Sequence, residues 1–191
     1  SQPLADDATI IGILGEVTLL RYFQETQGMR PQVATIAADT DAQRLAAIAR
    51  VVEQGRAVYL MRPLPGIERT YALRAVGPLI EALTPRQAAQ PPAAPGVTAA
   101  QAVFGERITL LGYRLGGLPS GLHAQAFPQV EINGAVESGG RLRLTLLWQA
   151  RQPMQNEYRV TARLKTPSGR LLWQTDGAPV HDNYATTVWQ P

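Results

Sequence analysis

The feature that most constrains this chain is a proline-rich segment at residues 84–98, which holds four prolines and one glycine. A segment of this composition favours extended, polyproline-like conformations and buries too little apolar surface to fold by itself. We therefore predict a linker at residues 86–100 between two domains, residues 1–85 and residues 101–191. The alternative is an ordered strap that packs against one of them.

The sequence before this segment alternates between the patterns of buried strands and amphipathic helices. Buried strands are expected at 8–14, 32–38 and 57–61, helices at 18–27 and 39–54, and further strands at 71–76 and 79–83. Strands separated by helices require crossover connections, and these join parallel strands. The first half is therefore expected to be an α/β domain, a small Rossmann-like unit with a parallel sheet.

After the segment the hydrophobic period becomes two, and no helical pattern interrupts it. Strands are expected at 107–115, 125–132, 141–149, 158–165 and 170–175. Glycine- and proline-containing turns separate these short strands, which is typical of an antiparallel β-sandwich. The fold class is thus α/β plus all-β.

Composition and charge exclude several classes of function. The chain has no cysteine, which rules out disulfides, thiolate metal sites and a cysteine nucleophile. Its net charge is +3, and its 17 arginines and single lysine are spread along the chain rather than gathered in the dense patch of a nucleic-acid binder. No apolar run approaches the roughly 18 residues of a membrane span. We expect no nucleic-acid partner, no metal and no cofactor.

Three carboxylates follow predicted buried strands, namely Glu16, Asp39 and Asp41. The carboxyl ends of parallel strands form the edge where open α/β sheets bind ligands, so these residues are candidates for a metal or sugar site. The bland interpretation is that Asp39 and Asp41 cap a helix and that Glu16 is a solvated loop residue. Residues 12–16 resemble a phosphate-binding loop in position only, because both glycine-rich phosphate motifs are missing.

A second candidate cluster lies near the end of the chain and contains Asp176, His181, Asp182 and Tyr184. Such a loop offers oxygen and nitrogen ligands, but its spacing matches no known metal loop, and Asp-Gly and Asp-Asn pairs are common turn formers. The tryptophans of the second half, Trp148, Trp173 and Trp189, are candidates for a platform that stacks on sugar rings. Core packing is the alternative, and we expect Trp148 in the core.

Two stretches carry a family resemblance. The first is LLRYFQ at residues 19–24 with GMRP at 28–31, and the second runs through FGERITLLGY at 104–113, LRLTLLWQ at 142–149, YRVTARL at 158–164, GRLLWQTD at 169–176 and YATTVW at 184–189. The first resembles the segment after the last membrane helices of polytopic glycosyltransferases of the protein-mannosyltransferase type, from filamentous phototrophic bacteria. The second is similar to a β-sandwich module appended to such proteins.

The resemblance implies a place outside the cytoplasmic membrane, next to a membrane-embedded transferase that uses a lipid-linked sugar. The catalytic carboxylate of those enzymes lies in a loop between membrane helices that this chain lacks, so no catalytic residue carries over. We therefore expect non-catalytic accessory domains that position an acceptor or bind a glycan or protein partner. The alternative is a free-standing carbohydrate-binding or adhesion module.

In the module that the chain resembles, the Trp-x-Pro at Trp189 to Pro191 leads into further strands. We therefore expect a piece of a longer protein, whose remaining part is a partner of these domains. A sandwich without its last strands has an open edge, which predicts pairing with a second copy.

Overall fold

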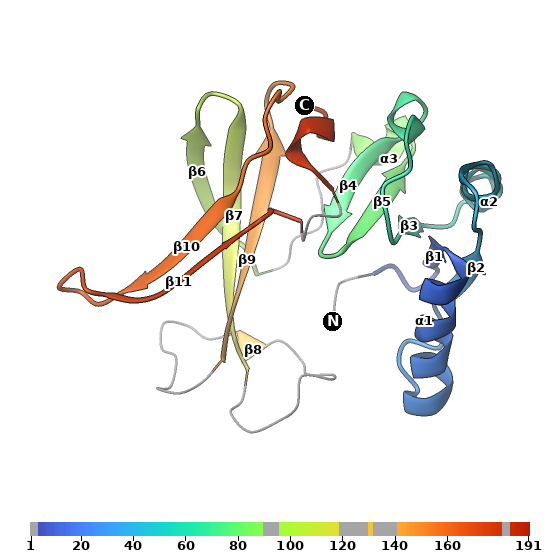
Figure 1. Cartoon of the computed structure of the whole chain (residues 1–191), viewed down its shortest axis with the longest axis horizontal. Coiled ribbons are helices and arrows are strands. Elements are labelled where there is room, and N and C mark those ends of the chain that lie inside the picture. Colours follow the sequence, from blue (N-terminus) through green and yellow to red (C-terminus); the bar gives the residue numbers. More distant parts are fainter. Residues whose placement is uncertain (1–3, 90–95, 119–129, 132–140, 181–183) are drawn as a thin grey trace. The chain divides into compact units, whose positions relative to one another are not determined.

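A computed structural model describes residues 4–89, 96–118, 130–131, 141–180 and 184–191 (Figure 1). The chain divides into two compact units, one that joins Gln2–Gln90 to Met154–Trp189 and one built around Pro91–Pro153. The sequence pattern assigns residues 101–191 to one domain, whereas the structure groups much of that stretch with the N-terminal sheet. Among the described residues no helix has both the length and the apolar character of a membrane span.

The first unit contains a five-stranded sheet whose strands are ordered β2-β1-β3-β5-β4. The strands are β1 (Thr9–Gly12), β2 (Ala34–Ala37), β3 (Val58–Leu60), β4 (Ala72–Val76) and β5 (Leu79–Leu83). The first three are parallel, as predicted, and the other two are antiparallel to their neighbours. The sheet is therefore mixed, because the turn at Gly77 and Pro78 folds β5 back onto β4 without a crossover.

Two helices cover opposite faces of this sheet, α1 (Leu14–Gln27) and α2 (Asp41–Glu53). One apolar cluster joins Ile48 of α2 to Ile11, and the other joins Leu20 of α1 to Ile10. Because Ile10 and Ile11 are consecutive in β1, their side chains point to opposite faces. Gly28 ends α1 in the left-handed conformation at φ 63°, as the sequence predicts.

Helical spacing in the sequence predicts an apolar stripe of Leu45, Ile48, Ala49 and Val52 for α2, and the structure buries a partly different set of residues. Ile48 is fully buried and Val52 packs against the core, but Leu45 is 41% exposed and Val51 takes its place. The helix starts at Asp41 on a Thr40 cap, and its buried residues are Arg44, Ala47, Ile48 and Val51. Leu45 lies one residue outside the buried sector.

A segment from far along the sequence completes the core on the α2 side of the sheet. Val180 and Tyr184 are buried in the cluster that holds Ile48, and Trp189 packs against it. A short 3-10 helix, η2 (Thr186–Val188), lies within this segment, and the Thr186 hydroxyl accepts a hydrogen bond from the Tyr158 N–H at 2.8 Å. A second 3-10 helix, η1 (Ile67–Arg69), contributes the buried Ile67.

The remaining strands form two antiparallel sheets. A four-stranded sheet contains β6 (Thr98–Phe104), β7 (Ile108–Leu118), β8 (Val130–Glu131) and β9 (Arg141–Ala150), and a hairpin is made of β10 (Val160–Lys165) and β11 (Leu171–Gly177). Within the predicted linker, a short helix α3 (Pro85–Ala88) and the start of β6 are ordered. Most of the strand expected at 125–132 lies outside the described residues. The α/β and antiparallel β content thus agrees with the expected fold class.

The four-stranded sheet has one tight spot, at Gly112 of β7. A Cβ atom on Gly112 would lie 2.4 Å from Val97 Cγ1 and 2.7 Å from the Thr98 carbonyl oxygen. The pairing of β7 with β9 shifts register between Leu110 and Gly112, which marks a bulge. Glycine at this position therefore lets the backbone of β6 approach β7 closely.

Candidate functional site

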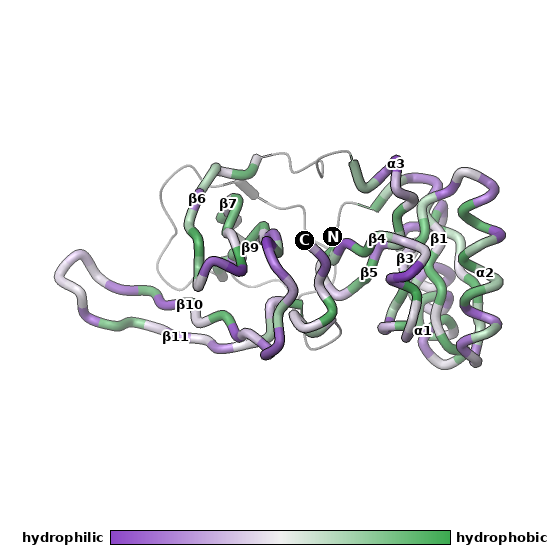
Figure 2. Tube along the Cα trace, turned by 90° about the horizontal axis from the view of Figure 1, so that it is seen from above, coloured by the Kyte–Doolittle hydropathy of each residue, from purple (hydrophilic) through white to green (hydrophobic). Residues whose placement is uncertain are grey.

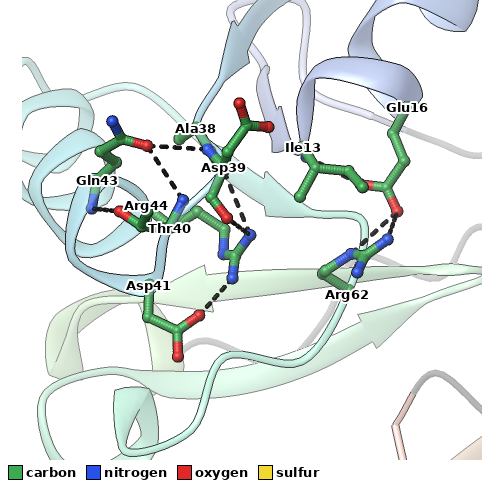
Figure 3. A network of polar contacts seen from close by, with 9 residues as sticks. All are labelled: Ile13, Glu16, Ala38, Asp39, Thr40, Asp41, Gln43, Arg44 and Arg62. Atoms are coloured by element: carbon green, nitrogen blue, oxygen red, sulfur yellow. Dashed lines mark hydrogen bonds and ion pairs between the residues drawn. The ribbon is translucent and has the colours of Figure 1, made fainter.

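The structure brings the three predicted carboxylates to one edge of the five-stranded sheet, at the carboxyl ends of β1 and β2 (Figure 3). Glu16 lies in the first turn of α1, Asp39 follows β2, and Asp41 opens α2. Two arginines join them, Arg62 after β3 and Arg44 in α2. The placement agrees with the prediction for the sheet edge.

Glu16 holds the start of α1 and the chain after β3 together. Its Oε2 accepts the Ile13 N–H at 3.0 Å, which satisfies a backbone donor at the helix start where isoleucine offers no capping oxygen. Its Oε1 accepts two hydrogen bonds from the Arg62 guanidinium, at 3.0 Å and 2.5 Å. The hydrogen bond to Glu16 and its negative charge raise the pKa of Arg62 above the usual range.

The backbone at Gly12 leaves space for this carboxylate. A Cβ atom there would lie 2.8 Å from Glu16 Oε2 and 3.1 Å from the sulfur of Met61. Gly12, at the end of β1, thus allows close packing beside Glu16, and this packing explains the glycine without a phosphate-binding role. Gly15 has no such neighbour.

Asp39 caps α1 rather than α2. Its Oδ1 accepts the Leu14 N–H at 2.8 Å, so a residue after β2 satisfies a second donor at the start of α1. The cap of α2 is Thr40, whose hydroxyl accepts the Gln43 N–H at 3.2 Å while Gln43 Oε1 accepts the Thr40 N–H at 3.1 Å. This reciprocal pair is a capping box.

Asp41 forms an ion pair with Arg44, which is only 7% exposed. Arg44 Nη1 donates to the carbonyl oxygens of Ala38 and Asp39, both at 3.3 Å. The arginine therefore satisfies the backbone at the end of β2, and Asp41 balances its buried charge. The Nε atom of Arg44 is buried without a hydrogen-bond partner among the described residues.

Every one of these carboxylates already has a structural partner. Glu16 binds Arg62, Asp39 binds the start of α1, and Asp41 binds Arg44. In the described part of the chain no three histidine, cysteine, aspartate or glutamate residues gather where they could hold a metal ion. The edge joins α1, α2 and the chain after β3, and the arrangement supports structure rather than acid–base chemistry.

The described residues of the second candidate cluster, Asp176 and Tyr184, lie in different environments, one exposed and one buried. Asp176 lies on the exposed surface of β11, and hydrogen bonds from the Thr161 hydroxyl and Gln174 Nε2 lower its pKa. Tyr184 is 5% exposed in the core, where burial and then the charge of Glu68 raise its pKa to about 12. His181 and Asp182 lie outside the described residues.

A polar group that the sequence analysis missed crosses three strands on the face that α1 covers. The Tyr59 hydroxyl donates to Glu81 Oε1 at 3.1 Å, and Arg74 Nε donates to Glu81 Oε2 at 2.8 Å. Burial, the charge of Glu81 and the hydrogen bond to it raise the pKa of Tyr59 to about 12. Arg74 and Glu81 are paired across the hairpin and stand at equal distances from its turn at Gly77 and Pro78. That symmetry is a sequence signal that would have found the pair.

Comparison of the chain with protein-family models, with curated proteins and with solved structures finds no significant match. The geometry described above therefore carries the functional argument by itself.

Proposed function

We propose that the chain is the non-catalytic, extracytoplasmic accessory part of a membrane-embedded glycosyltransferase-like protein. In this role it positions an acceptor or binds a glycan or protein partner. The observation that carries the proposal is the engagement of Glu16, Asp39 and Asp41 in ion pairs and helix caps. A general acid or base must reach a substrate, and each of these carboxylates is instead bonded to an arginine or to the backbone at a helix start.

The finer features of the fold belong to the same proposal. The order β2-β1-β3 with helices on both faces supports a Rossmann-like arrangement of the parallel strands. The antiparallel four-stranded sheet would supply one layer of the β-sandwich. Apolar side chains exposed on the four-stranded sheet support such a layer, namely Val103, Phe104, Leu115, Leu142 and Leu144.

Two partners follow from this proposal. The first is the remaining, membrane-embedded part of the parent protein. The second is another copy of the chain, which would pair along β9. Among the described strands β9 is hydrogen-bonded to β7 alone, so one side of its ten residues carries backbone groups available to another strand.

The free-standing carbohydrate-binding module is the second candidate. Its support is Trp173, which is 55% exposed on β11, whereas Trp148 is half-buried against Phe104 and Trp189 packs on the core. The expectation that Trp148 lies in the core is thus met only in part. An exposed indole ring can stack on a sugar.

The complete gene tests the main proposal directly. We expect several apolar segments of about 20 residues in the same reading frame, upstream of the region that encodes this chain. A reading frame without them would contradict a membrane-embedded parent. Sedimentation of the unaltered chain and of Leu144→Lys tests the pairing along β9. If the chain forms a dimer through this edge, the lysine should convert it to a monomer, whereas a chain that is already monomeric should sediment as before.

Calorimetric titration with oligosaccharides separates the two candidates. A sugar site that disappears in Trp173→Ala would favour the free-standing module. Glu16→Gln serves as the matched control, because its carboxylate belongs to the sheet edge and should not alter sugar binding at β11. Loss of sugar binding in Glu16→Gln would show instead that the carboxylates at the sheet edge contribute to the sugar site.

A further inference from the structure

The β10–β11 hairpin exposes large apolar side chains at the end that carries its turn. Leu164 is paired with Trp173 across the two strands, and the register shifts between Leu164 and Lys165. About half of each of four apolar side chains is exposed there, those of Leu164, Leu171, Leu172 and Trp173. Figure 2 shows hydrophobic and hydrophilic stretches along the same hairpin. An exposed group of this kind marks an interaction surface.

Positive charge surrounds these apolar residues. Residues 158–175 contain four basic side chains and no acidic one, and they include Lys165, the single lysine of the chain. The four, Arg159, Arg163, Lys165 and Arg170, are all exposed, and none forms an ion pair within the described ranges. Arg163 Nε donates to the neutral Gln174 at 2.8 Å, and its charge acts on Asp176 without a direct ion pair among the described residues.

The other end of the hairpin is held differently. Val160, Ala162 and Gly177 are half-buried, whereas every residue from Arg170 to Asp176 is exposed. Two acids border the basic stretch, Glu157 and Asp176, and Asp176 is bonded to Thr161 and Gln174 at this held end. Lys165 and Arg170 therefore lie with the apolar residues toward the turn, where the strands pair with each other alone among the described strands, whereas Arg159 precedes β10 at the other end. A two-stranded ribbon with an uncovered apolar surface is marginally stable in water and gains from a partner.

We propose that the turn end of the β10–β11 hairpin, formed by Leu164, Lys165 and Arg170 to Trp173, docks on a membrane surface rich in anionic lipids. Basic side chains are attracted to the negative surface potential of such a membrane. Leucine and tryptophan side chains insert into the boundary between headgroups and acyl chains, where tryptophan is enriched in membrane proteins. The proposal goes beyond the accessory role and does not depend on its glycan or protein partner.

The residues around Trp173 favour lipid over sugar. Sugar sites surround the aromatic ring with polar groups that fix the hydroxyls of the ligand. The residues that precede Trp173 are Leu171 and Leu172, and its cross-strand partner is Leu164. These side chains offer no hydrogen bonds to a sugar, and the charged residues nearest to the turn, Lys165 and Arg170, are both positive.

Co-flotation of the 191-residue chain with lipid vesicles tests the proposal. The vesicles contain phosphatidylglycerol and phosphatidylcholine in equal parts, and pure phosphatidylcholine vesicles serve as the neutral comparison. We expect binding to the anionic vesicles that weakens as salt is added, because salt screens the attraction. Equal binding to neutral vesicles, or no binding to anionic ones, overturns the proposal.

Two variants locate the contact. Lys165→Glu/Arg170→Glu should lower the partition coefficient on anionic vesicles by at least about 25-fold, as expected from the attraction of each basic residue. Arg50→Glu/Arg86→Glu makes the same change in net charge on exposed arginines of α2 and α3, and it should bind nearly as wild type. Equal losses in both double variants would show that net charge alone acts, which contradicts docking by the hairpin.

Trp173→Ala should weaken binding by about tenfold, through loss of apolar area. All three variants change exposed side chains, and circular dichroism and thermal unfolding verify that they remain folded. Because the salt dependence is measured on the unaltered chain, the proposal stays testable if a variant fails to fold. An oligosaccharide site lost in Trp173→Ala, together with no affinity for anionic vesicles, would overturn the proposal in favour of a sugar platform.

Discussion

The five-stranded sheet and the β10–β11 hairpin both contain apolar and charged side chains, but the two regions differ in how far these side chains are buried and paired. In the sheet, apolar side chains are covered on both faces, and even charged residues such as Arg44 and Glu81 are buried with partners. In the hairpin, Leu172 and Trp173 remain exposed, and the basic residues have no acidic partner in the described ion pairs. The sheet thus supplies the stability of the first unit, and the hairpin supplies its adhesive surface.

The largest expected difference between the two regions is in core packing. Ile48→Ala should lower the free energy of unfolding by about 2–5 kcal/mol, because it removes buried methyl groups and leaves a cavity. Leu172→Ala on the hairpin should change it by less than about 0.5 kcal/mol. Urea unfolding of both variants measures the difference. Similar losses in the two variants would mean that the hairpin is as closely packed as the sheet.

The buried ion pair gives the next largest effect. Glu81→Ala leaves Arg74 and the Tyr59 hydroxyl without their shared acceptor, and it should cost about 2–3 kcal/mol, below the value for a fully buried pair because Arg74 reaches solvent. Glu81→Gln keeps an acceptor and should cost less. Arg163→Ala, which removes an exposed hydrogen bond of the hairpin, is the matched control and should have little effect. If Arg163→Ala lowered the free energy of unfolding as much as Glu81→Ala, the polar contacts of the hairpin would be as important for stability as those of the sheet.

A third substitution tests how closely the strands of the four-stranded sheet in the other unit are packed. Gly112→Ala places a Cβ atom against the carbonyl oxygen of Thr98, so β6 and β7 must separate. We expect a loss of about 1–3 kcal/mol in the free energy of unfolding, the range for overpacking. Gly177→Ala is the control, because nothing lies within 4 Å of a Cβ atom there. Equal stability of the two variants would show that the β6–β7 contact yields easily.

The smallest effect appears only in alkaline solution. The pKa of Tyr59 and that of Tyr184 are raised from 10.0 to about 12 in the folded chain, so folding favours their neutral forms. The stability that this provides is complete below pH 10 and is lost as the pH rises toward about 12. Tyrosinate absorbance should show two of the six tyrosines ionising late or only on unfolding. Tyr59→Phe should remove one of the two, and titration of all six near pH 10 would contradict both burials.

The sequence predicts those parts of the fold that depend on neighbouring residues. Continuous apolar runs identify β1, β2 and β3, and Gly28 marks the end of α1, because burial pattern and helix termination are local. The sheet edge was also predictable, since the carboxyl ends of parallel strands meet there. The partners of its carboxylates were not, because Arg62 reaches Glu16 from 46 residues away and Asp39 caps a helix that starts 25 residues earlier.

Other features depend on the competition between distant segments. Arg44 occupies a position that helical spacing assigns to an apolar residue. Its burial is stabilised by hydrogen bonds to two backbone carbonyls and by the ion pair with Asp41. Val180 and Tyr184 border a polar, turn-like stretch of sequence, yet both are buried in the N-terminal core. Propensity and period cannot predict either placement, because both describe only the residues near each position.

The burial of Val180 and Tyr184 beside Ile48 also sets an order of events for the nascent chain. A ribosome that has finished the last strand of the five-stranded sheet must still add about a hundred residues before these side chains emerge, a delay on the order of 10 s. Until then one face of the sheet lacks part of its cover, and chaperones would have a defined interval in which to bind it. The slow step of maturation is therefore expected to be the return of a late segment to a structure that was started first.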